Sequence, residues 1–143
     1  MTSLIFPDVN VWLSISYPIH THHASTLAWF NGLEPEVNLA FCRHTQLGFF
    51  RLMTTASIMG VDVKSQLECW NIYDRWILPG KARLLSEPPS LEPRLRRLTV
   101  GDRATPKLWA DAYLAAFAAA AKVPLVTFDR ALAERAPGSI LLS

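Results

Sequence analysis

The sequence predicts an α/β protein, built as a three-layer α/β/α sandwich around a central, mainly parallel sheet. Short apolar runs alternate with longer segments in which apolar residues recur at helical spacing. Strands that alternate with helices are joined by crossovers, and this arrangement favours parallel pairing. The chain has 143 residues, of which 50% are hydrophobic, so it can bury a substantial core. Apart from an alanine-rich tract, no repeat, linker or low-complexity segment interrupts it, and we expect a single domain over residues 1–143.

The first half of the chain predicts two strands and four helices. Tyr17-Pro18 ends the first helix, because a residue before proline is pushed out of the helical region. Pro79-Gly80 stops the last helix of this half. In chain order, the expected elements are a strand at Ser3–Phe6, helices at Val9–Ser16 and Ala24–Leu33, a strand at Val37–Phe41, and helices at His44–Thr55 and Val61–Leu78.

The second half predicts three strands and three helices. Ser90 is the expected N-cap of a brief helix. Thr105-Pro106 is a strong helix start, since a hydroxyl cap is followed by proline in the first turn. The expected elements are a strand at Ala82–Leu85, helices at Leu91–Leu98 and from Thr105 to about Lys122, a strand at Leu125–Phe128, a short helix from Asp129 to Pro137-Gly138, and an edge strand at Ile140–Leu142.

Composition and charge narrow the class of protein. The formal net charge is only +2, so the whole chain is not expected to adhere strongly to nucleic acid. Cys42 and Cys69 form no CxxC pair and lie in apolar helical patterns, which is typical of reduced core residues. We see no secretory signal, and no apolar run reaches the roughly 18 residues of a membrane span. We therefore expect a cytoplasmic protein that does not associate with membranes.

Three aspartates interrupt the apolar pattern. Asp8 and Asp129 each follow a predicted strand and precede a helix, where a carboxylate can serve simply as an N-cap. Asp111 lies in the second turn of the alanine-rich helix, beyond the capping position. A carboxylate in such apolar surroundings is costly unless it is paired. The candidate partners of Asp111 are Lys107 one turn earlier, a distant arginine or a metal ion.

The three aspartates are more informative together than separately. In α/β sheets, ligands collect at the carboxyl ends of the strands, where Asp8 and Asp129 are expected. Carboxylates gathered there would repel one another, and a divalent cation would remove that repulsion. Carboxylate and water ligands suit Mg²⁺ or Mn²⁺. Such ions serve phosphoryl chemistry by activating water and by neutralising charge on the phosphate.

Three sequence blocks, taken in order, resemble the signature blocks of PIN-domain ribonucleases. They are Phe6-Pro7-Asp8-Val9-Asn10-Val11-Trp12, Trp109-Ala110-Asp111-Ala112-Tyr113-Leu114-Ala115-Ala116 and Val126-Thr127-Phe128-Asp129-Arg130. The chain is most similar to the VapC toxins of bacterial toxin–antitoxin pairs, and the resemblance covers essentially its whole length. It implies a PIN-like fold and a Mg²⁺- or Mn²⁺-dependent endoribonuclease that cleaves cellular RNA with metal-activated water. It also implies a cognate VapB-type antitoxin and a homodimer.

The resemblance assigns roles to individual residues. It implies that Asp8, Asp111 and Asp129 are the catalytic and metal-binding carboxylates. Asn10 and Thr127 match positions that usually support the site through hydrogen bonds. Because Thr127 precedes Asp129 by two residues on a strand, both side chains project to the same side, and the hydroxyl could orient the carboxylate or a metal-bound water.

One position departs from the family pattern. PIN-domain ribonucleases usually supply a further glutamate from the helix expected here at His44–Thr55, and that position matches Gln46. Glutamine offers a neutral oxygen or an N–H donor, so the site has one negative charge fewer and we expect weaker metal binding. The alternative is a glutamine that is merely hydrogen-bonded within its own helix.

Other polar and aromatic residues carry weaker signals. Arg130, Arg43 and Arg51 are candidates for contacts with RNA phosphates, and ordinary surface charge is the alternative for each. The histidines after the first helix have no second ligand cluster, so we interpret them as an exposed helix entry; they are His20, His22 and His23.

The five tryptophans lie mostly on apolar helical faces and are expected in the core. Trp70 and Trp76 could instead form a surface for self-association.

Two other functions remain open from the sequence. A catalytically weak or inactive PIN-like module that binds nucleic acid or protein is compatible with Gln46. A haloacid-dehalogenase-like phosphatase also places an aspartate after its first strand, but it normally has a second aspartate two residues later, where this chain has Asn10. The later lysine block of such phosphatases is also missing in convincing form.

Overall fold

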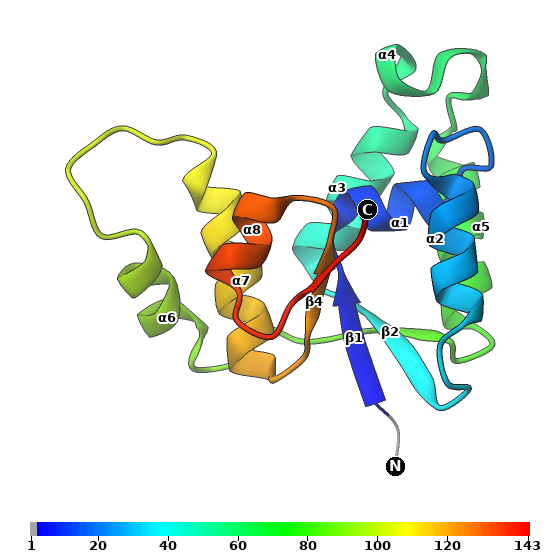
Figure 1. Cartoon of the computed structure of the whole chain (residues 1–143). Helices are drawn as coiled ribbons and strands as arrows, with labels where there is room; N and C mark the ends of the chain where they lie inside the picture. The colour runs from blue at the N-terminus through cyan, green and yellow to red at the C-terminus, as the bar shows by residue number, and fades with distance from the viewer. Residues whose placement is uncertain (1–2) are drawn as a thin grey trace.

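Five parallel strands form the centre of the molecule in the computed structural model, which describes residues 3–143 (Figure 1). The order across the sheet is β3-β2-β1-β4-β5, and all four pairings are parallel. The chain therefore adds strands on one side of β1 first and then on its other side. The strands are β1 (Ser3–Pro7), β2 (Val37–Phe41), β3 (Ala82–Leu84), β4 (Leu125–Thr127) and β5 (Ile140–Leu141).

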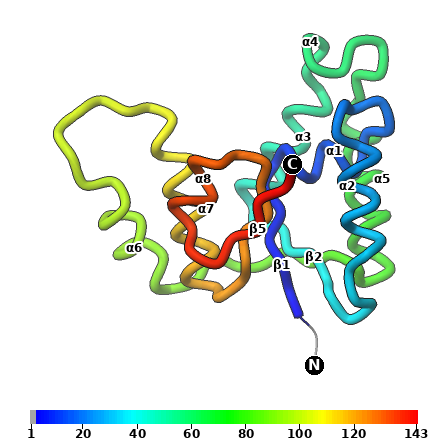
Figure 2. Tube along the Cα trace, viewed as in Figure 1, coloured from blue at the N-terminus to red at the C-terminus, as the bar shows by residue number. Residues whose placement is uncertain are grey.

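Helices cover both faces of this sheet, and the predicted three-layer α/β/α architecture is confirmed (Figures 1 and 2). A short helix and a 3-10 turn connect the third and fifth helices; they are α4 (Ala56–Met59) and η1 (Gly60–Asp62). The first layer consists of α1 (Val9–Ser16), α2 (His23–Asn31), α3 (Arg43–Met53) and α5 (Gln66–Ile77). The second consists of α6 (Leu91–Leu98), α7 (Leu108–Ala121) and α8 (Arg130–Arg135). Within residues 3–143, no helix is both long and apolar enough to cross a membrane.

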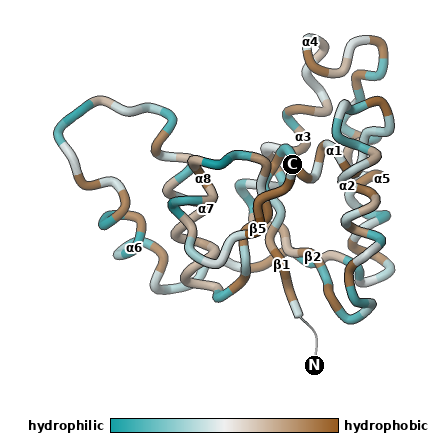
Figure 3. The backbone as a smooth tube through the Cα atoms, viewed as in Figure 1, coloured by the Kyte–Doolittle hydropathy of each residue, from teal (hydrophilic) through white to brown (hydrophobic). Residues whose placement is uncertain are grey.

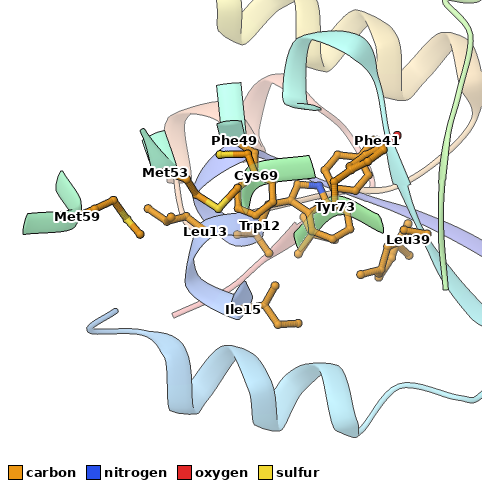
Figure 4. Close-up of a cluster of buried hydrophobic side chains, with 14 residues drawn as sticks. Trp12, Leu13, Ile15, Leu39, Phe41, Phe49, Met53, Met59, Cys69 and Tyr73 are labelled. Carbon is orange, nitrogen blue, oxygen red and sulfur yellow. The ribbon is translucent and has the colours of Figure 1, made fainter. Parts of the chain in front are cut away.

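The central strands are mainly hydrophobic (Figure 3). They send alternate side chains into two cores. Leu39 and Phe41 face the first core, under α1, α3 and α5, whereas Phe6 and Leu125 face the second, under α7. Trp12 anchors the first core (Figure 4), where it is fully buried and stacks on Phe41 with ring centroids 3.8 Å apart. Burial on both faces explains why these strands read as continuous apolar runs.

The pairing of β1 with β4 determines where the polar residues after these strands lie. Phe6 pairs with Leu125, and the N–H of Asp8 donates to the carbonyl of Val126 at 2.9 Å. The strand order reverses between β1 and β4, and in open α/β sheets ligands bind beyond the carboxyl ends of the strands at such a point. Asp8, which follows β1, and Asp129, which follows β4, therefore lie at the same edge of the sheet.

Two predicted helix boundaries are wrong. The helix expected from Val61 begins only at Gln66, because the Ser65 hydroxyl and the Glu68 carboxylate form a capping box there. The helix expected from Thr105 begins at Leu108, after a turn in which the N–H of Leu108 donates to the carbonyl of Thr105. Ser90 precedes α6 as predicted, but its side chain makes no capping hydrogen bond.

The prediction that the tryptophans lie in the core holds for three of them only. Trp12 is fully buried, and Trp29 and Trp76 pack against the first core. Trp70 is 46% exposed and Trp109 is 64% exposed. Helical spacing alone could not distinguish these two, since their helices present apolar residues on more than one side. The cysteine prediction is confirmed, because Cys42 and Cys69 are both free and buried.

Helix α3 approaches the start of α1 most closely at Gly48, where an added methyl group would lie 2.7 Å from Cγ2 of Val9. We predict that Gly48→Ala lowers the free energy of unfolding by about 1 kcal/mol, because overpacking of about 1–3 kcal/mol exceeds the gain of about 1 kcal/mol in helix propensity. Urea denaturation of Gly48→Ala, Val9→Ala and the double variant checks this. The double variant should be more stable than the sum of the single effects predicts, and strict additivity would contradict the contact.

Candidate metal centre

Asp8 is a buried carboxylate at the end of β1, with only 5% of the residue exposed. It is the N-cap of α1, and its Oδ1 accepts a hydrogen bond from the N–H of Val11 at 3.2 Å. Its Oδ2 accepts a hydrogen bond from the hydroxyl of Thr127. Within residues 3–143, no lysine, arginine or histidine forms an ion pair with Asp8. The carboxylate is hydrogen-bonded but lacks a cation, which is a costly state for a buried charge.

Thr127 forms hydrogen bonds with both Asp8 and Asp129. Its hydroxyl donates to Asp8, and its Oγ1 accepts the backbone N–H of Asp129 at 3.0 Å. The side chain is fully buried, so neither interaction competes with water. The structure thus brings Asp8, Thr127 and Asp129 together at the carboxyl edge of the sheet.

Asp129 is the N-cap of α8 and the more exposed member of the pair. Its Oδ1 accepts the N–H of Leu132 at 3.1 Å. Its Oδ2 lies 3.3 Å from the ammonium nitrogen of Lys107, which precedes α7. Both Asp8 and Asp129 therefore cap helices, as the simple N-cap interpretation predicts, and in each the second carboxylate oxygen has a side-chain partner.

The two carboxyl groups have opposite pKa shifts. Burial raises the pKa of Asp8 above its ordinary value of 3.8, against the hydrogen bonds from Thr127 and backbone N–H groups, and the negative charge of Asp129 raises it further. The hydrogen bond from the N–H of Leu132 lowers the pKa of Asp129, and the Lys107 ammonium lowers it too. Two neighbouring carboxylates whose pKa values are driven apart are typical of functional sites.

Asp111 stands on the first turn of α7 and is partly buried. It precedes the buried residues Leu114 and Ala115 by about one turn, so it lies on the same side of the helix. Lys107, a candidate partner from the sequence, pairs with Asp129 instead. Within residues 3–143, the Asp111 carboxylate has no ion pair or hydrogen bond, and no three His, Cys, Asp or Glu side chains are arranged to hold a metal. Asp111 thus does not complete a three-carboxylate cluster in this structure.

Gln46 is 1% exposed and faces the first core. Its Oε1 accepts a hydrogen bond from Nη1 of Arg43 at 2.7 Å. Burial raises the pKa of the Tyr73 hydroxyl, and the nearby Gln46 side chain acts in the opposite direction. Among the described residues, no hydrogen bond links Gln46 to Asp8, Asp111 or Asp129. Its role at the site stays a prediction.

The remaining predicted residues lie around the edge of the sheet. Asn10 is exposed in the first turn of α1, and its contribution to Asp8 is a backbone N–H bond. Arg130 follows Asp129 and is exposed. Arg43 and Arg51 are exposed at the two ends of α3. His22 stacks on Phe128 with ring centroids 4.8 Å apart, on the side of β4 opposite to Thr127.

The arrangement suits a hard divalent cation. Mg²⁺ is commonly bound by one or two protein carboxylates, with water and substrate phosphate completing its octahedral shell. Asp8 supplies a buried carboxylate with which no side-chain cation of residues 3–143 forms an ion pair. Asp129 already binds one cation, the ammonium group of Lys107. The donor set therefore fits Mg²⁺ or Mn²⁺ without a cage of protein ligands.

Lys107 forms its ion pair with a carboxylate other than the one that its position in the sequence suggested. Its spacing suggested a partner four residues later, at Asp111, because residues one turn apart are neighbours on a helix. The late start of α7 leaves Lys107 just outside the helix, from where its side chain reaches Asp129. Only a correct helix boundary could have revealed this contact.

Fold and site define a class: parallel α/β proteins that gather carboxylates at the switch point of the sheet. The family model of the PIN domain matches residues 5–137. Ribonuclease VapC41 of Mycobacterium tuberculosis is 34% identical over 140 residues, which cover 92% of each chain, and Ribonuclease VapC39 of the same species is 28% identical over 99% of this chain and 98% of its own. VapBC2 from Rickettsia felis, solved bound to a promoter DNA fragment, shares the fold with a TM-score of 0.58, at 14% identity over 97% of each chain. The chain belongs to the PIN-domain family.

The Thr127 hydroxyl can be tested separately from the carboxylates. We predict that Thr127→Val weakens Mn²⁺ binding by about 10- to 100-fold, the usual effect of losing a group that orients a metal ligand. Thr127→Ser keeps the hydroxyl and should stay within a few-fold of wild type. Isothermal titration with Mn²⁺ measures both, and equal affinities for Thr127→Val and wild type would remove Thr127 from the site.

The pKa of Asp8 predicts how stability depends on pH. A carboxyl group whose pKa is raised by folding contributes stability below its unfolded pKa of 3.8, and that contribution is lost as pH rises through the folded pKa. In metal-free buffer, Asp8→Asn should therefore unfold at a higher temperature than wild type at pH 7. The difference should shrink as pH falls toward 3.8. A wild type that is more stable than Asp8→Asn at pH 7 would show that the buried charge does not oppose folding.

Proposed function

We propose that this protein is the toxin of a type II toxin–antitoxin system, a Mg²⁺- or Mn²⁺-dependent endoribonuclease that cleaves cellular RNA. The observation that carries the proposal is the pair Asp8 and Asp129, joined through Thr127 at the switch point of the sheet. Membership of the PIN-domain family and the similarity to VapC ribonucleases support the reaction class.

Asp8 and Asp129 would hold the cation, and Asp111 would approach from the first turn of α7. When bound, the cation supplies Lewis acidity, which activates water and neutralises charge on the scissile phosphate. Thr127 holds the carboxylate of Asp8 and the backbone of Asp129, and the Val11 N–H keeps Asp8 oriented. By analogy with the family, the 3′ oxygen leaves, so the products carry 5′-phosphate and 3′-hydroxyl ends.

RNA would reach this edge of the sheet through basic side chains. Arg130 follows Asp129 directly, and Arg43 stands at the start of α3. Arg51, in the last turn of α3, is close enough to His44 to lower the pKa of its imidazole, although burial of that ring is the larger cause. Contacts of this kind position the RNA backbone without reading its sequence.

The proposed partners follow from the family. A VapB-type antitoxin would neutralise the enzyme, and the structural similarity to VapBC2 supports a partner of this kind. We propose a homodimer as well, for which the exposed side chains of Leu67 and Trp70 on α5 provide an apolar surface. Trp76 is excluded from that surface, since it packs edge-on against Trp12. Residues 1–143 would act as one domain in the cytoplasm, which is consistent with two free cysteines.

A binding module without catalysis is the alternative that a specific observation favours. Gln46 is engaged by Arg43, and the described residues offer two neighbouring carboxylates without a third. Such a module would bind RNA or protein but would not cleave RNA. The phosphatase alternative is disfavoured, because Asn10 is exposed and its side chain makes no hydrogen bond with Asp8.

Replacement of Asp8 tests the proposal. We predict that Asp8→Asn lowers the rate of RNA cleavage by more than about 100-fold, since even groups that only orient a metal ligand cost 10- to 100-fold. Asp129→Asn should have a similar effect, and both variants should lose toxicity on induced expression. RNA-end sequencing after induction and cleavage assays with Mn²⁺ measure these effects. Arg96→Gln, on the exposed face of α6, serves as the control with unchanged cleavage. Full activity of Asp8→Asn would contradict the proposal.

A further inference from the structure

Lys107 is the only cation within residues 3–143 that forms an ion pair with a candidate metal-site carboxylate. Its ammonium nitrogen lies 3.3 Å from Oδ2 of Asp129. The residue ends the connection between α6 and α7, in which residues 100–107 are all exposed. The ammonium group therefore reaches Asp129 from a solvent-exposed segment of the chain.

The contact between Lys107 and Asp129 uses Oδ2 of the carboxylate. Oδ1 of Asp129 is committed to the N–H of Leu132, so Oδ2 is the oxygen available to a metal ion. Lys107 occupies this oxygen, and a divalent cation bound there would meet the ammonium group at close range. The side chain of Lys107 is 76% exposed, so the ion pair is weak and readily exchanged.

We propose that Lys107 has two alternative partners: it balances Asp129 while no divalent cation is bound, and it binds an RNA phosphate once a cation has taken Asp129. The inference rests on the proposed metal-dependent function. Lys107 and the divalent cation then compete for one carboxylate oxygen, whereas the cation and RNA favour each other's binding through the release of Lys107. Such coupling is reciprocal by thermodynamic necessity.

The geometry favours a phosphate as the second partner. A lysine displaced from Asp129 remains tethered beside the start of α7 and close to Asp129, where the scissile phosphate would lie in the proposed function. Its ammonium group is a compact cation on a flexible stem, suited to phosphate oxygens. Arg130, the neighbouring exposed cation in sequence, makes no ion pair with Asp129 and lacks this exchange.

Competition with the metal can be measured directly. Isothermal titration of Mn²⁺ into wild type, Lys107→Met and Lys122→Met compares the removal of a lysine at each end of α7. Lys107→Met should bind Mn²⁺ about two- to fivefold more tightly than wild type, the scale set by a weak exposed ion pair. Lys122→Met should match wild type, because Lys122 caps the far end of the helix.

The second partner is tested without metal, in buffer containing EDTA, where no metal-dependent cleavage occurs. Fluorescence anisotropy with a single-stranded RNA oligonucleotide of mixed sequence measures affinity as a function of salt. In the Asp129→Asn background, where Lys107 is released, Lys107→Met should reduce the salt slope by about 0.7, as expected for one lost phosphate contact on a single strand. With Asp129 intact, the same replacement should change the slope less.

Each outcome separates this inference from the proposed function. Tighter Mn²⁺ binding by Lys107→Met alone supports the competition, even if wild type binds too weakly to measure. Equal Mn²⁺ affinities of Lys107→Met and wild type overturn the inference while the metal site stands. If neither wild type nor any variant binds Mn²⁺, both this inference and the proposed metal-dependent function are overturned. Equal salt slopes with and without Lys107 in the Asp129→Asn background overturn the phosphate contact.

Discussion

The candidate site depends on a single hydroxyl group. Thr127 donates its one proton to Asp8 and accepts the N–H of Asp129, so one buried side chain holds both the carboxylate of Asp8 and the backbone of Asp129. This requires the parallel register in which the Asp8 N–H bonds to the Val126 carbonyl. A slip of one residue would turn Thr127 to the opposite face of the sheet. Helices α1 and α8 both begin at these residues, so their positions depend on the same register.

Folding alone does not account for the charge of Asp8. An asparagine or serine could cap α1 equally well without burying a carboxylate. Burial and the neighbouring Asp129 both raise the pKa of Asp8, so its ionised form opposes folding at neutral pH. Asp129 differs, since the Leu132 N–H and Lys107 stabilise its ionised form. The surroundings thus stabilise the ionised form of Asp129, whereas the hydrogen bonds to Asp8 do not offset the cost of its burial.

The sequence predicted those features of the fold that local sequence patterns control. The parallel sheet, the three layers and the capping positions of Asp8 and Asp129 follow from apolar runs and their ends, whereas the order of the strands across the sheet was not predicted. The starts of α5 and α7 did not, because Ser65 and Glu68 form a stronger cap than Val61 provides, and because Thr105-Pro106 forms a turn before the helix. Side-chain partners such as that of Lys107 depend on these boundaries. Contacts across layers require tertiary structure, which no spacing rule supplies.

The neutral residue at position 46 has a consequence for its neighbour. Nη1 of Arg43 lies 2.7 Å from Oε1 of Gln46, so a glutamate there would meet a guanidinium group. Its charge would be largely balanced by Arg43 and only partly offered to a metal ion. With glutamine in place, the exposed Arg43 keeps its full positive charge at the start of α3. Within residues 3–143 no carboxylate forms an ion pair with Arg43, so the neutral residue at position 46 leaves the guanidinium charge unbalanced.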